Sequence, residues 1–163
     1  MAAATYTYVT VLDEIRLALD WKGTDKIMSD AEINRFIFEH IMAEESTWVF
    51  QKVTTGLYKN YHGYSYGLML YNPTFTGEDD CVYLVNARGS ISVTTGTHST
   101  ETINVTGARV DFPTVMVDIL HWLATHRCKE ISESVGGGSV SSTSVAREIR
   151  DMIEYWQGVT VLK

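Results

Sequence analysis

One short motif in the sequence has the residue types of a hydrolase nucleophile. Gly63-x-Ser65-x-Gly67 matches G-x-S-x-G, the sharp turn that lifts a nucleophilic serine off a strand. Acid and base candidates follow it in the order of such a triad: Asp79, Asp80, His98, His121 and His126. That chemistry also needs a helix directly after the serine, and Pro73 leaves no room for one. We interpret the match as a chance pattern, and a small serine hydrolase built on Ser65 stays an alternative.

Two groups of residues have types that could hold a metal ion. His121, His126 and Cys128 lie close together in a helix-like stretch. Histidines on a helix chelate best four residues apart, and a spacing of five turns the two side chains about 140° from each other. His40 and Glu44 have the better spacing but lack a third ligand nearby in the sequence. We therefore expect no metal and no cofactor.

The charge balance bears on which partners the chain can bind. There are 13 basic and 20 acidic residues, which gives a net charge of −7. Such a chain repels phosphates, so binding to nucleic acid through charge is not expected. No apolar run approaches the roughly 18 residues of a membrane span. Cys81 and Cys128 match no metal-binding or redox spacing, and we expect both to be buried free thiols.

A tyrosine-rich stretch over residues 57–75 is the feature most suggestive of a contact surface. Tyrosine is enriched in interfaces because its rigid ring buries a large area at little entropic cost. The candidate interface residues are Tyr58, Tyr61, Tyr64, Tyr66, Tyr71 and, beyond this stretch, Arg88. The same tyrosines could instead pack over the domain's own sheet, and the sequence leaves both interpretations open.

Helical patterns occupy the two ends of the chain. Val9, Leu12, Ile15 and Leu19 trace one face of a first helix. Ser29 and Glu32 form a capping box that begins a second helix, whose apolar stripe continues through Trp48 and predicts an end between residues 45 and 55. A third helix is expected to begin at Pro113, and a fourth to span residues 144–158 after a Gly/Ser-rich loop.

The middle of the chain predicts strands. Residues 81–85 and 90–94 flank a short turn and read as a hairpin, and residues 102–106 alternate as a third strand with Ser and Thr pointing outward. We therefore predict a mainly helical α+β fold: a small four-helix bundle with an antiparallel three-strand insertion between helices 2 and 3. All of residues 1–163 would form one domain, with a helical core at 8–55 and 111–158 and a β-rich insertion at about 57–107.

This order of elements resembles the head–tail adaptor (connector) proteins of tailed bacteriophages. The likeness rests on three stretches that run from Ser29 through Ala43-Glu-Glu, from Asp111 to Ala124 and from Ile149 to Trp156. It covers most of the chain as an order of elements and an apolar pattern, without a signature motif. In that family a helical bundle carries a β-rich insertion between its second and third helices.

The resemblance implies a non-enzymatic structural role. Such a protein forms a ring with copies of itself, usually twelve, beneath the portal protein, and it contacts a tail-side connector or tail protein. Double-stranded DNA passes through the ring only as the travelling genome, and no membrane is involved. The expected location is the virion, with assembly in the host cytoplasm. Besides the serine hydrolase, a soluble module that binds a host protein remains an alternative.

Overall fold

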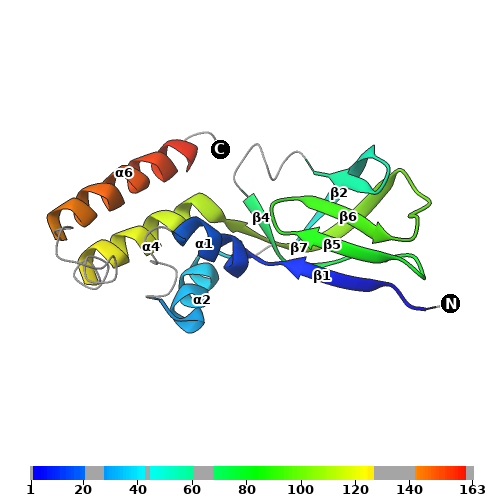
Figure 1. Cartoon of the computed structure of the whole chain (residues 1–163), viewed down its shortest axis with the longest axis horizontal. Coiled ribbons are helices and arrows are strands. Elements are labelled where there is room, and N and C mark those ends of the chain that lie inside the picture. Colours follow the sequence, from blue (N-terminus) through cyan, green and yellow to red (C-terminus); the bar gives the residue numbers. More distant parts are fainter. Residues whose placement is uncertain (1, 21–27, 43–44, 61–67, 127–141, 161–163) are drawn as a thin grey trace. The chain divides into compact units, whose positions relative to one another are not determined.

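A computed structural model describes residues 2–20, 28–42, 45–60, 68–126 and 142–160 (Figure 1). The fold is α+β, dominated by a curled, mixed sheet of seven strands, with four helices in the described ranges. The prediction of a mainly helical four-helix bundle with a three-strand insertion is therefore wrong. Contacts within the chain divide it into two compact units, one of strands and one of helices.

The strand unit comprises Met1–Val11 and Ile41–Asp111. Its strands are β1 (Thr5–Val9), β2 (Ser46–Thr54), β3 (Leu57–Lys59), β4 (Leu68–Thr74), β5 (Val82–Asn86), β6 (Ser90–Thr95) and β7 (Thr102–Asp111). They lie in the order β1-β5-β6-β3-β2-β7-β4. Only the β1–β5 pair is parallel, so the sheet is largely antiparallel.

The sheet curls around a core that its own strands supply. Buried side chains gather on its inner side: Trp48, Phe50, Tyr58, Leu70, Cys81, Tyr83, Val85, Ile91, Ile103 and Val105. The backbone N–H of Leu70, on edge strand β4, donates to the carbonyl of Ala87, just beyond β5, at 2.9 Å. This bond links edge strand β4, the last in the sheet order, to the end of β5, the second. The sheet must therefore curl back toward itself.

The helical unit comprises Leu12–His40 and Phe112–Lys163. Its helices are α1 (Val11–Leu19), α2 (Asp30–Glu39), α4 (Phe112–His126) and α6 (Ser142–Thr160). α4 packs against both α6 and α2. Phe112 meets Trp156 edge-on at 5.3 Å between ring centroids, and Phe36 meets Trp122 at 6.4 Å. These contacts place α4 at the centre of the unit.

Two predicted helix boundaries are wrong. Val9 belongs to β1, and α1 begins at Val11. α2 ends at Glu39, where His40 caps it by donating its N–H to the carbonyl of Ile37, and residues 46–54 form β2 rather than the end of a long helix. β2 pairs with β7 over six residues, and this pairing buries Trp48 on the inner side of the sheet.

Local signals elsewhere in the sequence predicted the elements correctly. The capping box is present, with the Ser29 hydroxyl accepting from the Glu32 N–H and the Glu32 carboxylate accepting from the Ser29 N–H. β5 and β6 form the predicted antiparallel hairpin, and β7 includes the predicted third strand. Pro113 lies in the first turn of α4. Within the described residues, none of the helices is long and apolar enough to cross a membrane.

The tight turn at Gly96 should be sensitive to any side chain. Gly96 has a φ of +81°, and an added Cβ would lie 2.8 Å from the Asp80 carbonyl oxygen and 2.9 Å from the Cys81 Sγ. We expect Gly96→Ala to destabilise the chain by about 1–3 kcal/mol, measured by urea denaturation.

Gly158 provides the matched control, because a Cβ there meets no atom within 4 Å. Since alanine is the better helix former, Gly158→Ala in α6 should be neutral or stabilising by up to about 1 kcal/mol. Equal losses in the two variants would contradict this account of the turn.

Candidate interaction surface

A hydrogen-bonded network around His98 ties together the loops at one end of the sheet. The His98 side chain is buried, with Nδ1 2.8 Å from the Tyr83 hydroxyl and Nε2 2.8 Å from the Thr100 Oγ1. The Thr100 hydroxyl donates to the Thr102 carbonyl at 2.7 Å. Because the single hydroxyl hydrogen of Thr100 is used in that bond, the Thr100 Oγ1 must accept a hydrogen from His98 Nε2. In the neutral ring Nδ1 is then an acceptor, so the Tyr83 hydroxyl donates to it.

Glu78 extends this network from the β4–β5 loop to the β6–β7 loop. Its carboxylate accepts from the Ser99 hydroxyl at 2.6 Å and from the Ser99 N–H at 2.9 Å, and its own N–H donates to the Tyr83 hydroxyl. The bonds from the Ser99 hydroxyl and N–H lower the pKa of the Glu78 carboxyl. The polar atoms of this end of the sheet are thus engaged with one another, which indicates a structural role.

Burial governs the two tyrosines beside this histidine. It raises the pKa of the Tyr83 hydroxyl to about 12, although the bond from the Glu78 N–H acts in the opposite direction. Burial also raises the pKa of Tyr58, and the carboxylates of Glu101 and Glu78 add to that effect. Both hydroxyls therefore stay protonated in the folded chain well above neutral pH.

A small cavity lies next to the network, with Lys52, Gly56, Tyr58 and His98 in its lining. Its volume is about 120 Å³. Clefts that bind organic ligands usually measure roughly 300–1,000 Å³. The cavity is therefore large enough for water or a small ion and too small for an organic substrate.

Among the described residues, Glu39, His40 and Asp118 form the one group of three metal-ligating side chains close together, with ligand atoms within 4.8 Å. His40 Nε2 lies 2.6 Å from Asp118 Oδ2, which is a direct hydrogen bond. A metal ion would have to displace that bond, so this trio is better described as a capped helix end tied to α4. Glu44, the sequence-predicted partner of His40, lies outside the described residues.

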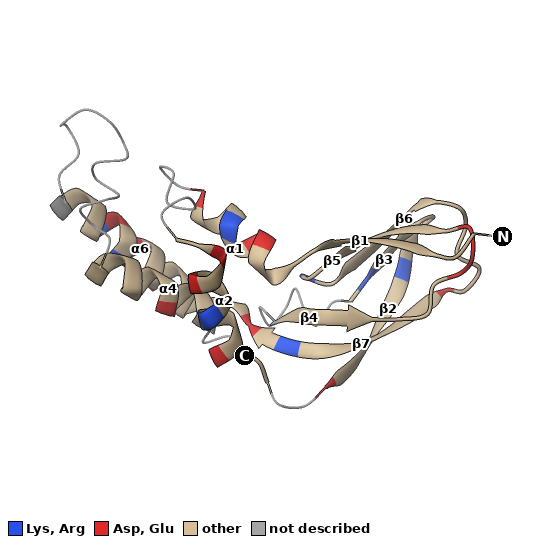
Figure 2. Cartoon of the chain, turned by 90° about the horizontal axis from the view of Figure 1, so that it is seen from below, with Lys and Arg blue, Asp and Glu red and all other residues tan. Residues whose placement is uncertain are grey.

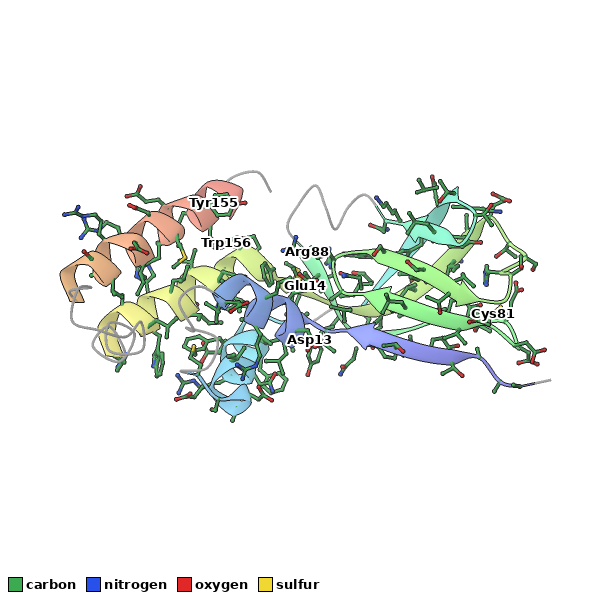
Figure 3. All side chains as sticks on the ribbon, viewed as in Figure 1. Asp13, Glu14, Cys81, Arg88, Tyr155 and Trp156 are labelled. Carbon is green, nitrogen blue, oxygen red and sulfur yellow. The ribbon has the colours of Figure 1, made fainter. Side chains whose placement is uncertain are left out.

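The structure places some of the other chemically suggestive residues. His121 and His126 are exposed on α4, where the His126 ring stacks on Trp122. Cys81, the free cysteine of the described ranges, is buried just before β5, as expected (Figure 3). Ser65 and Cys128 lie outside the described residues, so the geometry of a Ser65 nucleophile is not tested.

Three of the candidate interface residues, Tyr58, Tyr71 and Arg88, lie within the described part of the chain. The Tyr58 side chain is 1% exposed and donates to the Thr100 carbonyl at 2.7 Å, so it belongs to the core of the sheet. Tyr71 is half-buried on β4, and Arg88 is exposed in the β5–β6 turn (Figure 3). Tyr61, Tyr64 and Tyr66 lie outside the described residues.

Comparison with family models, with curated proteins and with solved structures found no match for this chain. Its possible surfaces must therefore be judged from their own composition. One such surface is the side of the curled sheet opposite the core, which we call the outer face. The outer face consists of Thr5, Thr7, Thr47, Val49, Gln51, Leu57, Lys59, Val82, Leu84, Asn86, Ser90, Ser92, Thr102, Asn104 and Thr106.

Strand registers show that these residues share one side, because laterally paired residues point the same way. One row crosses five strands in the order Asn86, Ser90, Lys59, Gln51 and Thr102. A second row crosses four strands in the order Thr7, Leu84, Ser92 and Leu57. Sequence reasoning identified outward Ser and Thr positions in the predicted strands but missed the continuous face, because β1, β2 and β3 were not recognised as strands.

Ionisation of Tyr83 should destabilise the fold at high pH. Its pKa is about 12 in the folded chain against an ordinary value of 10.0. The raised pKa contributes stability that is complete below pH 10 and is lost as the pH rises through about 12. We expect urea midpoints to fall more steeply over this interval for the wild type than for Tyr83→Phe.

Tyr83→Phe also loses its hydrogen bonds, so it should be about 1–3 kcal/mol less stable than the wild type at neutral pH. The matched control is Tyr155→Phe, since Tyr155 is 65% exposed and should leave the alkaline decline unchanged (Figure 3). If Tyr83→Phe declines as steeply as the wild type, another group controls the alkaline transition.

Proposed function

We propose that this chain is a non-enzymatic structural subunit of a virion, a head–tail adaptor that forms a ring between the portal protein and the tail. The observation that carries the proposal is that most of the strand unit, Ile41–Asp111, lies between two helical segments of the chain. The chain leaves the helices at His40 and returns to them at Phe112. This part of the order of elements agrees with the resemblance to phage adaptors, although β1 precedes the first helix and joins the inserted strands in a seven-stranded sheet rather than a three-stranded one.

The charge of the chain suits a ring through which DNA passes. A net charge of −7 repels phosphates, so a channel built from such subunits would let DNA slide rather than hold it. DNA is then a passing genome and not a ligand of the subunit.

Each unit also offers exposed apolar side chains for protein partners. Leu17 on α1 is 71% exposed and Tyr155 on α6 is 65% exposed in the helical unit, while Val49 on β2 is 46% exposed in the strand unit. Single exposed apolar residues are common, so these positions support the proposal only together with the order of elements. In this proposal the partners are neighbouring copies, the portal protein and a tail-side protein.

The proposal predicts that the protein travels with assembled particles. A lysate of infected host cells would be separated on a density gradient, and the protein quantified by mass spectrometry across the fractions. We expect co-migration with megadalton particles at a fixed, low copy number for each particle, because a ring holds a defined number of subunits.

A soluble host enzyme measured in the same gradient is the control for carry-over into the particle fractions. Residence of the protein in the soluble fractions alone would contradict the adaptor role. A one-to-one complex with a host protein in those fractions would favour the host-directed binding module instead.

A further inference from the structure

The outer face differs in charge from the rest of the chain. Lys59 is the one charged residue among its 15 members, in a chain of which 20% of the residues are charged. In Figure 2 the strands are tan along most of their length, and acidic residues colour the loops at one end of the sheet. Those loops contain Glu78, Asp79 and Asp80. The outer face therefore carries one positive charge while the whole chain carries −7.

We propose that the outer face is where a second copy of this chain docks. This inference rests on the proposed ring, because it names the surface through which neighbouring subunits meet. Two copies that each carry −7 repel each other over most approaches. The outer face itself contains no Asp or Glu, so a neighbour that approaches it meets no carboxylate from that face. Lys59 lies in the middle strand of the five-strand row.

The charge pattern also favours a contact between unlike surfaces. A face that carries one positive charge is complementary to the acidic remainder of a neighbouring copy, and less so to an identical face. Contacts between two different patches continue around a rotation axis and close into a ring, whereas contacts between identical patches stop at a dimer. The second copy therefore presents a different, acidic surface to the outer face.

The side chains of this face suit a protein neighbour better than a nucleic acid or a lipid. Binding to phosphates would need several cations, and Lys59 is the one cation among the 15 residues of the outer face. Binding to a bilayer would need a larger apolar area, whereas Ser, Thr, Asn and Gln predominate here. The threonines and valines are β-branched and stiff, so ordering them at an interface costs little side-chain entropy.

The test adds one carboxylate to the outer face where β2 pairs with β7. Val49 is 46% exposed and lies beside Asn104 in the β2–β7 pair. Val49→Glu places a charge at this point, and Asn104→Asp adds one nearby without changing the shape of the side chain. The matched controls are Ala31→Glu and Asn34→Asp on α2, which change the net charge equally. Thermal melts of all four variants check that each one is folded.

The copy number of each folded variant in particles is then measured by mass spectrometry. We expect a loss of about tenfold or more for Val49→Glu and Asn104→Asp, because like charges brought together across an interface are strongly unfavourable. The two controls should keep the wild-type copy number. Wild-type copy numbers in all four variants, or equal losses in all four, would overturn the inference and leave the adaptor role intact.

A photo-crosslinking amino acid at position 49 identifies what covers the face. Cross-links to another copy of the chain support the inference, and cross-links only to a different virion protein or to a lipid overturn it.

If the wild type is missing from particles, the adaptor role fails, and sedimentation velocity of the purified chain decides the inference separately. Self-association that Val49→Glu abolishes and Ala31→Glu does not would support the inference; a monomer at every concentration would overturn it.

Discussion

The strand unit depends on the aromatic packing that fills the inner side of its curled sheet. The Tyr83 ring is fully buried, stacks on Tyr6 at 5.6 Å between centroids and meets Phe75 edge-on at 5.3 Å. Because side chains alternate along a strand, holding Tyr83 inward forces Leu84 outward. A register slip of one residue would exchange the two faces and bury the hydroxyls of the outer face. The composition of the outer face is therefore a consequence of the core packing behind it.

The parts of the fold that short-range signals determine could be predicted from the sequence. The capping box at Ser29 depends on residues three apart, and the β5–β6 hairpin on residues joined by a short turn. β2 could not be recognised in this way, because Trp48 also fits the helical spacing of the preceding stripe. Helix propensities differ by at most about 0.7 kcal/mol for ordinary residues, whereas burying a large apolar side chain contributes roughly 1.5–3 kcal/mol. Pairing with β7 buries both Trp48 and Phe50, so the long-range contact outweighs the local preference.

The candidate surface was less predictable than the fold, for a related reason. Tyrosine enrichment does not distinguish an interface from a core. The burial of Tyr58 depends on the pairing of β3 with β6, two strands that lie far apart in the sequence. The outer face becomes visible only when the strands are placed in their spatial order, which differs from their order in the chain. One local signal was available, since Thr5-Tyr-Thr-Tyr-Val9 alternates β-branched and aromatic residues as a strand does.

Net charge and local charge have separate effects in this chain. A broad sheet surface of Ser, Thr and a few apolar residues has few charges of its own that would repel another copy of the chain. The net charge of −7 supplies that protection from elsewhere, because copies repel one another unless the approach brings complementary surfaces together. A uniformly acidic surface would repel in every orientation, and a wholly uncharged one would associate in many. In the proposed assembly, an acidic chain with one nearly uncharged face would restrict contact between copies to a few orientations and so give a defined geometry.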